Sequence, residues 1–507
     1  MVPGAKACAS PSGMKNSRRL AQRASALQSA GMNSIELLEP RIAPAILTPV
    51  VTKGTLTITH DTNSATTEKL VLTQTGPDSF TLNDTLAAVG FGPFSGVKNV
   101  AITLGEAGPT ADLRFSNDGL PGNLTINTGN GGSDIGIRTV NGSAGRIAGA
   151  VKIIGGNFAD KVLVEDGLAI TKPVVFDGHD GSDEFRARDA YLAKKLTLES
   201  VETITIEDIS PVVIGGMLVE NEEANAAVVF VLSNVSTIAG PLTYCGSDTV
   251  TDTVTLDGQV IGPALLMLFG GVNDVSSAGN FSSSLKITGA GGTDSVLFRT
   301  KSLNLGDPLE GPFITAKVAG PLAIKLGDGA NDVTFTDGSV FAKGFSIVGG
   351  KDADTINFAK FNADKNVSLN LGSGANTLTD LGGGLGANFI SGSFSYTGGG
   401  DADTVNLDGL IAGKIKIILG NGTNGVDGIA RIIGASAGIT GGTGADTVSL
   451  TLHSTAGALT AKLGDGADAF TFNGGALASV KLDGGKGTDT LTGLANLPVK
   501  RTISGFE

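Results

Sequence analysis

The side chains with the clearest chemistry in this chain are Asp and Asn residues that end glycine-rich turns at a nearly constant spacing. In the C-terminal half these turns end, about 22 residues apart, at Asn331, Asp354, Asn376, Asp403, Asn424, Asp446, Asp468 and Asp489. Carboxylates and turn carbonyls can bind a hard cation, whereas Asp and Asn can also cap tight turns while glycine supplies a positive φ. We expect capping at most of the turns and keep cation binding as the alternative.

The elements that must position these residues are short strands. After the turns the sequence alternates apolar and polar residues, as in Val333–Thr334–Phe335 and Ile356–Asn357–Phe358. A period of two indicates a half-buried strand, and a unit of strand, turn and strand must stack on its neighbours to bury its apolar face. The sequence therefore predicts an all-β parallel β-helix, or β-solenoid, with rungs of about 22 residues. A 44-residue double unit stays open, because two turn types alternate.

The repeat also sets the predicted domain boundaries. Residues 1–46 differ in composition and are expected to be a basic N-terminal segment, disordered or partly helical. Residues 47–507 form the predicted solenoid domain. Within it, residues 204–284 contain apolar runs interrupted by prolines, and we expect irregular rungs or a lateral insertion there.

Charge and hydropathy restrict the classes of partner. The chain has a net charge of −13, and residues 1–45 hold six basic and two acidic side chains, so the remainder is more acidic still. An acidic body argues against nucleic acid, because proteins bind phosphates mainly through Lys and Arg. No run of about 18 apolar residues occurs, so no transmembrane segment is expected.

Residues 35–45 read Ile-Glu-Leu-Leu-Glu-Pro-Arg-Ile-Ala-Pro-Ala. Their Leu-Glu-Pro-Arg core resembles the LEPR-type N-terminal segment of large exported and surface proteins of planctomycete-type bacteria. The match covers about ten residues and departs after Arg41, where Ile-Ala-Pro replaces the commoner leucine-rich continuation. The resemblance implies export, by a route that the motif does not disclose, and hence a secreted or cell-surface location.

One turn, Gly441–Ser449, reads Gly-Gly-Thr-Gly-Ala-Asp-Thr-Val-Ser, and Gly484–Thr492 is nearly equivalent. Both resemble the Gly-Gly-x-Gly-x-Asp nonapeptide of RTX-type β-rolls. That resemblance implies calcium, which takes about six to eight oxygen ligands. This chain departs from the RTX pattern, in which nonapeptides run in tandem, because it has one such turn per rung and about 13 unrelated residues between turns.

Stacked rungs would place the turn residues in a column at spacings of about 4.8 Å. From Asn331 to Asp446 the column alternates Asn and Asp, which keeps like charges apart without an ion. Asp446, Asp468 and Asp489 are consecutive, so a bridging cation would relieve their repulsion. The candidate calcium ligands are therefore Asp446, Asp465, Asp468 and Asp489, followed by Asp354 and Asp403.

Catalysis has little support in the sequence. His60, His179 and His453 are widely separated, and no metalloprotease or serine-hydrolase motif occurs. Parallel β-helices include polysaccharide lyases and glycosidases, but sugar clefts favour aromatic platforms, and the chain has no Trp and three Tyr. We therefore predict no catalytic residues and no enzyme, with a polysaccharide lyase or glycosidase as the alternative. A rung that gathers Asp, Lys and Arg in one groove would favour that alternative.

These observations predict an exported or surface-attached structural, adhesive or matrix protein that acts as a stiff rod. Its expected partners are cell-envelope or extracellular-matrix components, including polysaccharide, and not nucleic acid. The chain stops at Glu507, before the next expected strand. An open edge at the last rung could therefore pair with a second copy, and a truncated reading frame or a fragment of a longer surface protein also stays open.

Overall fold

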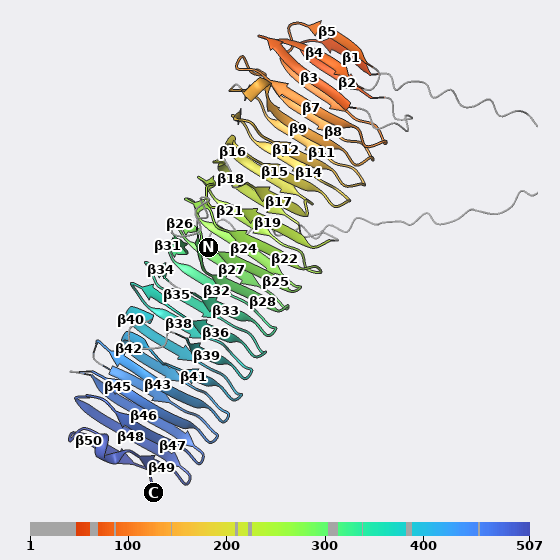
Figure 1. Cartoon of the computed structure of the whole chain (residues 1–507). Helices are drawn as coiled ribbons and strands as arrows, with labels where there is room; N and C mark the ends of the chain where they lie inside the picture. The colour runs from red at the N-terminus through yellow and green to blue at the C-terminus, as the bar shows by residue number, and fades with distance from the viewer. Residues whose placement is uncertain are drawn as a thin grey trace, which may run out of the picture.

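The computed structural model describes residues 47–60, 69–85, 88–142, 144–207, 211–221, 226–302, 313–336, 338–381, 388–434, 436–454 and 457–507. They form a parallel β-solenoid of about 17 turns of roughly 22 residues, seen as a long stack of strands in Figure 1. The predicted fold class is therefore confirmed. The two short 3₁₀ helices are η1 (Val140–Gly142) and η2 (Leu494–Asn496). In the described part of the chain, no helix is long and apolar enough to cross a membrane.

Most rungs contribute a strand before the glycine-rich turn and a strand after it, and equivalent strands of successive rungs pair in parallel. We call these two stacks the pre-turn ladder and the post-turn ladder. The pre-turn ladder contains β2 (Thr55–Thr59), β6 (Asn99–Thr103), β8 (Leu124–Asn127), β11 (Val151–Ile154), β14 (Val174–Asp177), β16 (Ala190–Glu199), β18 (Val213–Glu220), β21 (Leu242–Cys245), β24 (Ala264–Phe269), β27 (Leu285–Gly289), β32 (Leu322–Lys325), β35 (Phe345–Val348), β38 (Val367–Asn370), β40 (Asn388–Thr397), β42 (Leu410–Ile418), β44 (Ser436–Thr440), β46 (Ala458–Asp465), β48 (Ser479–Lys486) and β50 (Arg501–Ser504).

The post-turn ladder carries the residues that follow the turns. It contains β3 (Lys69–Gly76), β7 (Thr110–Phe115), β9 (Asp134–Thr139), β12 (Lys161–Val164), β15 (Glu184–Ala187), β17 (Thr203–Ile206), β19 (Val228–Leu232), β22 (Asp252–Leu256), β25 (Asn273–Ser277), β28 (Asp294–Phe298), β33 (Asp332–Phe335), β36 (Thr355–Phe358), β39 (Thr377–Asp380), β41 (Thr404–Asn406), β43 (Gly425–Ile432), β45 (Thr447–His453), β47 (Ala469–Gly474) and β49 (Thr490–Thr492).

A third stack of shorter strands closes most rungs. It contains β10 (Arg146–Ile147), β13 (Leu168–Ile170), β20 (Thr237–Ile238), β23 (Gln259–Val260), β26 (Asn280–Phe281), β31 (Lys317–Val318), β34 (Ser339–Phe341) and β37 (Phe361–Ala363). The first residues of β16, β18, β40 and β42 and the last residues of β43 pair in the same stack.

The core lies inside the solenoid and runs along its whole length. In β33, Val333 and Phe335 are buried, while Asp332 and Thr334 point outward and are half-buried. Because most strands bury one face in this way, the buried residues form a single continuous cluster. Phenylalanines of successive rungs stack inside it, as Phe298 and Phe335 do with ring centroids 5.2 Å apart.

The two ends of the stack are built differently. At the N-terminal end, β1 (Thr48–Thr52) pairs antiparallel with β2, and β4 (Ser79–Asp84) and β5 (Val89–Phe94) extend β3 as an antiparallel meander. These strands cover the edges of the first parallel rung, which blunts edges that could otherwise pair with another chain. At the other end, β49 and β50 each pair with one described strand, β47 and β48 respectively.

Residues 204–284, expected to hold irregular rungs or a lateral insertion, contain regular rungs in their described part. There β17, β19, β22 and β25 pair in order in the post-turn ladder, and β18, β21, β24 and β27 pair in order in the pre-turn ladder. A departure from the stack comes later in the chain. There β29 (Thr300–Ser302) and β30 (Phe313–Thr315) form a separate two-stranded antiparallel sheet.

Candidate functional site

The Asp and Asn residues that end the turns form one buried column. At nearly every step a side-chain oxygen accepts the backbone N–H of the column residue on the preceding rung, as Asp468 Oδ1 does from Asp446 N at 2.8 Å. Each member is at most 5% exposed. The column comprises Asp160, Asp183, Glu202, Asp252, Asn273, Asp294, Asn331, Asp354, Asn376, Asp403, Asn424, Asp446, Asp468 and Asp489.

The Asn members make a second contact that Asp cannot make. Asn331 Nδ2 donates to Asp354 Oδ1 at 2.8 Å and to the carbonyl oxygen of Gly329 at 2.8 Å. Asn376 and Asn424 repeat this bridge to the next Asp, at 3.1 Å and 2.8 Å. The alternation predicted to keep carboxylates apart therefore also supplies a donor to each of these Asp side chains.

Glycine is required five residues before the Asp that ends most Asp-type turns. A Cβ at Gly398 would lie 1.7 Å from Asp403 Oδ2, and one at Gly349 would lie 1.8 Å from Asp354 Oδ2. The Asn-type turns have leucine at the same position instead, as in Leu371. The structural rung is thus about 22 residues, whereas the chemical repeat spans two rungs.

Burial raises the pKa of several column carboxylic acids. It raises the pKa of Asp183 to about 8, with the charges of Glu202 and Asp160 adding to the effect. It raises the pKa values of Asp252 and Asp294 to about 6. Burial therefore shifts these three carboxylic acids toward the uncharged form, because charge in a dry environment is costly.

The six residues predicted as calcium ligands divide into two groups. Five lie in the buried column, and their Oδ1 atoms accept hydrogen bonds from backbone N–H groups or the backbone and amide N–H groups of Asn. Asp465 lies outside it, exposed, with Oδ2 3.1 Å from Lys486 Nζ. Among the described residues, no group of three or more His, Cys, Asp or Glu side chains is placed to hold a metal ion.

Asp468 breaks the alternation and makes the C-terminal end of the column unusual. Leu463 precedes it by five residues, as leucine precedes the Asn members, yet the residue is Asp. The amide donor that elsewhere bridges to the next Asp is therefore missing above Asp489. The Oδ2 atoms of Asp468 and Asp489 are buried and lack a hydrogen-bond partner among the described residues, as do those of Asp354, Asp403 and Asp446, so the missing amide is what distinguishes this end.

The column has a second acidic run that sequence reasoning missed. Asp160 N donates to Asp183 Oδ1 at 2.7 Å, and Asp183 N donates to Glu202 Oε2 at 2.7 Å. Glu202 immediately precedes the strand Thr203–Ile206, as the turn residues precede theirs, so its place in the repeat could have identified it. Its turn lacks the glycine pattern, which is why it was overlooked.

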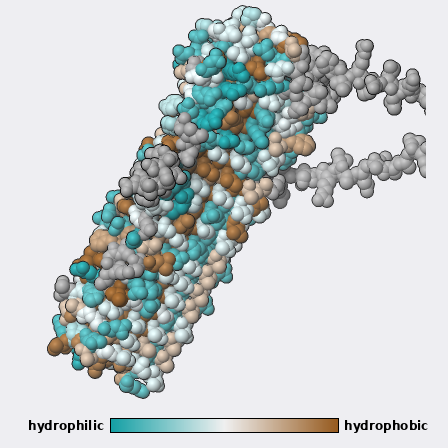
Figure 2. Space-filling view, viewed as in Figure 1, coloured by the Kyte–Doolittle hydropathy of each residue, from teal (hydrophilic) through white to brown (hydrophobic). Residues whose placement is uncertain are grey.

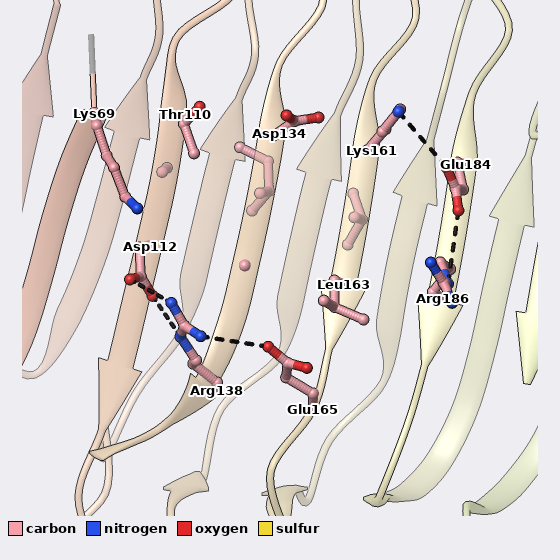
Figure 3. A pocket seen from close by; sticks show the side chains of 14 residues that line it. Lys69, Thr110, Asp112, Asp134, Arg138, Lys161, Leu163, Glu165, Glu184 and Arg186 are labelled. Atoms are coloured by element: carbon pink, nitrogen blue, oxygen red, sulfur yellow. Dashed lines mark hydrogen bonds and ion pairs between the residues drawn. The ribbon is translucent and has the colours of Figure 1, made fainter. Parts of the chain in front are cut away.

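A second candidate site lies on the outer surface of the post-turn ladder, over the N-terminal rungs. Figure 2 shows hydrophilic residues gathered over this part of the stack. Figure 3 shows charged side chains from neighbouring strands lining a hollow. We call this hollow the charged groove, and its outward-facing residues are Lys69, Thr110, Asp112, Asp134, Gly136, Arg138, Lys161, Leu163, Glu165, Glu184 and Arg186.

One wall of the charged groove is a chain of ion pairs. Arg138 Nη2 lies 2.6 Å from Asp112 Oδ2, and Arg138 Nη1 lies 3.5 Å from Glu165 Oε1. Arg114 Nη2 also contacts Asp112 Oδ2, at 2.7 Å, and Arg188 pairs with Glu165. The side chains of Asp112 and Glu165 are only 4% and 6% exposed, so these contacts fix the wall.

The opposite wall and the mouth carry looser charges. Lys161 Nζ lies 4.0 Å from Glu184 Oε2, and Arg186 lies 3.7 Å from Glu184 Oε1 and also pairs with Glu207. Lys69 and Asp134 stand at the mouth in Figure 3. Neither has an ion pair with another described residue.

Gly136 forms the floor of the groove, between Asp112 and Leu163 on the neighbouring strands. The nearest atom to a Cβ placed there would be the carbonyl oxygen of Ala111, at 3.9 Å, so the space would accept a side chain. The hollow has a volume of about 340 Å³. Glycine inside a strand weakens it, and such a position often marks a place where a ligand approaches closely.

The charges of the fixed wall are held in their ionised forms. Burial opposes ionisation of Asp112, but hydrogen bonds from Arg138 and Arg114 outweigh it and lower the pKa of Asp112. The hydrogen bond to Asp112 raises the pKa of Arg138. The groove therefore presents fixed charges of both signs at neutral pH.

The charged groove escaped sequence reasoning because its residues come from different rungs. Asp112, Arg138, Glu165 and Arg186 are separated by more than twenty positions each and become neighbours only when the strands pair in register. All of them take outward-facing positions along the post-turn strands, and this shared place in successive repeats could have identified the groove. His60, His179 and His453 lie on different rungs, and His179 Nδ1 contacts Asp177 Oδ1 at 2.7 Å.

Comparisons of this chain with protein-family models, curated proteins and solved structures found no match. The LEPR-type and RTX-type resemblances therefore stay predictions, as do export and calcium binding.

Proposed function

We propose that the protein is an exported or cell-surface scaffold whose solenoid acts as a stiff rod in an adhesive or matrix role. The observation that carries this proposal is the unbroken pairing of both ladders from the N-terminal cap to the last rung. At about 4.8 Å per rung, about 17 rungs give a rod of roughly 80 Å. Each rung is bonded to its neighbours by backbone, core and column, so bending the rod requires breaking several contacts at once.

Export and the cell-surface location rest on the LEPR-type segment, with the acidic composition as secondary support. Cell-envelope or matrix components, including polysaccharide, are the partners that fit this location, and pairing of last rungs between two copies is a further contact that the role allows. Antibodies against the solenoid should label intact producing cells as strongly as permeabilised ones. Labelling that appears only after permeabilisation would overturn the proposed location. Small-angle scattering of the full chain tests the rod separately, through its cross-section and length.

Calcium stabilisation is part of the proposal, at Asp468 and Asp489. These two carboxylates are consecutive in the column with no Asn amide between them, their buried Oδ2 atoms lack hydrogen-bond partners in the described part of the chain, and carboxylate oxygens are ligands that calcium prefers. Calcium bound between the two carboxylates would offset their mutual repulsion, which no Asn amide relieves at this step of the column. A cation that binds only the folded protein raises its melting temperature. The melting temperature should therefore be higher in calcium than in EGTA, and an unchanged melt would reject calcium at this site.

The alternative of an enzyme acting on polysaccharide has one observation in its favour, because the charged groove gathers Asp, Lys and Arg on neighbouring rungs. Against it, hydrogen bonds from Arg138 and Arg114 lower the pKa of Asp112, whereas a general acid needs a raised pKa. Release of reducing ends or of unsaturated products from polysaccharides by the wild type, lost in Asp112→Asn, would establish the enzyme. Absence of turnover across such substrates would leave the scaffold.

A further inference from the structure

We propose that the charged groove binds a neutral, polyhydroxylated chain, namely a glycan without net charge, laid across the outer face of β7, β9, β12 and β15. This deepens the scaffold proposal by naming the surface and the ligand chemistry. The two can fail separately, because scattering reports the rod and ligand titration reports the groove.

The groove is open at Gly136. A side chain would fit there, since its Cβ would come no nearer than 3.9 Å to any neighbouring atom. Glycine at this position lets a ligand approach the strand backbone closely. The volume of about 340 Å³ falls in the range of about 300–1,000 Å³ typical of ligand sites.

The lining restricts the charge of the occupant. Asp134 and Glu184 face the groove together with Arg138 and Lys161 (Figure 3). An anionic ligand would meet these carboxylates, and a cationic ligand would meet the Lys and Arg side chains, so either pays for a like-charge contact. A neutral ligand avoids both costs.

The hydrogen-bonding groups of the occupant must suit both carboxylates and basic side chains. A hydroxyl donates one hydrogen bond and accepts others, so a polyol can donate to the carboxylates and accept from Lys and Arg at the same time. Hydrogen bonds to ionised partners are stronger than neutral ones. Lys69 and Asp134 line the groove and are exposed, so their charged groups can contact a ligand.

The lining also separates a glycan from other neutral chains. No described Phe, Tyr or Trp side chain lines the groove, so a nucleobase or an aromatic side chain would find no stacking surface. A glycan would bind here through hydrogen bonds to charged side chains, without the aromatic platform that sugar clefts favour. A peptide that adds to a sheet needs a free edge, whereas the groove lies on the face of the ladder between paired strands. A chain of sugar hydroxyls meets the side chains of successive rungs without either requirement.

The test is calorimetric titration of the full-length protein with cellohexaose, maltohexaose, mannohexaose and xylohexaose as neutral probes. Hexagalacturonate and hexaglucosamine are the anionic and cationic probes. We expect at least one neutral hexasaccharide to bind, at least about tenfold more tightly than either charged one. Binding by none of the neutral probes, or tighter binding of a charged one, would overturn the proposal.

Two variants locate the site, and a third controls for misfolding. Gly136→Leu fills the hollow and should weaken binding at least about tenfold. Gly425→Leu is the matched control: Gly425 starts β43 on the same ladder, and its Cβ would meet no atom within 4 Å. Asp134→Ala removes an exposed carboxylate and should weaken binding several-fold with an unchanged melting temperature. Wild-type affinity in Gly136→Leu, or equal losses in Gly136→Leu and Gly425→Leu, would contradict a site in this groove.

Discussion

The N-terminal and C-terminal rungs of the post-turn ladder have the same interior and different exteriors. Inside, both have a column residue, a glycine beneath an Asp carboxyl and alternating buried apolar side chains. Outside, β7, β9, β12 and β15 present charged residues. The equivalent outward positions along β39, β41, β43 and β45 are mostly uncharged: Thr377, Thr379, Leu381, Thr404, Asn406, Asp408, Gly425, Asp427, Ile429, Thr447, Ser449 and Thr451.

This difference indicates which face carries a specific function. Thr on an exposed strand face suits the β conformation and needs no partner, so the C-terminal exterior is what stacking alone would select. Nearly buried ion pairs such as Asp112–Arg138 add little net stability, because desolvation offsets their attraction. Stability alone therefore does not account for them, and a second nearly buried cluster, Asp257 with Arg299 and Lys301, lies farther along the stack.

The largest predicted effect is the loss of stability when a methyl group is placed beneath an Asp carboxyl. Measuring it at both ends shows whether the N-terminal and C-terminal interiors are equivalent. Gly178→Ala and Gly398→Ala should each lower the free energy of unfolding by about 3 kcal/mol, because a Cβ would lie 2.5 Å from Asp183 Oδ2 or 1.7 Å from Asp403 Oδ2. The outward-facing controls Gly136→Ala and Gly425→Ala should change it by about 0.5 kcal/mol or less. Urea unfolding followed by circular dichroism measures all four. A large loss in only one region would show that the interiors differ.

The pH dependence of stability should separate the acidic runs at the two ends. The pKa of Asp183 rises from 3.8 to about 8 on folding, so its neutral form stabilises the fold fully below pH 3.8, and this contribution is lost as the pH rises through about 8. The melting temperature should fall between pH 5 and pH 9. Asp183→Asn cannot ionise and keeps the acceptor for Asp160 N, so its melting temperature should fall less. Parallel slopes in the two proteins would exclude Asp183 as the cause.

Removing Arg138 from the wall of the charged groove should lower the free energy of unfolding by somewhat less than the glycine substitutions do. Arg138→Ala leaves Asp112 and Glu165 nearly buried with one cationic partner each, so we expect a loss of about 2 kcal/mol. Lys351→Ala is the C-terminal control, because Lys351 and Asp328 form an exposed pair that should not affect the unfolding midpoint measurably. Equal effects in the two variants would mean that the groove wall is no more ordered than the open surface.

The sequence was sufficient for the interior because stacking repeats the same requirement on every rung. A buried position such as Phe335 and a column position such as Asp354 recur with the period, so a single sequence displays each many times. The column in register, with its alternation of Asn and Asp, followed from that period alone. The hydrogen bonds from backbone N–H groups to the column side chains could not be predicted from the period, because they depend on how each rung stacks on the next.

The exterior could not be predicted in the same way. Gly136 resembles any other strand glycine until Asp112 and Leu163 are known to flank it. Glu202 is a column member although its turn lacks glycine, and Asp465, predicted as a calcium ligand beside the column residues, points to Lys486. In each case the missing information was which residues of different rungs lie side by side.

The smallest predicted effect concerns the C-terminal acidic run and has a reciprocal control. Asp468→Asn would restore the amide that Asn424 uses to reach Asp446 Oδ1 at 2.8 Å, so we expect a gain of about 1 kcal/mol in calcium-free buffer at pH 7. Asn424→Asp removes that amide one rung pair away and should cost a similar amount. A loss of stability in Asp468→Asn would mean that the carboxyl group of Asp468 makes a contact that an amide cannot replace.

The same pair of variants distinguishes a shared proton from calcium between Asp468 and Asp489. If a proton bridges the two carboxyl groups, calcium leaves the melting temperature of the wild type unchanged, and Asp468→Asn is the more stable protein with or without it. If calcium bridges them, it raises the melting temperature of the wild type and has no effect on Asp468→Asn. Asn424→Asp would then gain a calcium response that the wild type lacks at that rung. The alternation of Asn and Asp along the column would in that case determine where the rod binds ions as well as how its turns are capped.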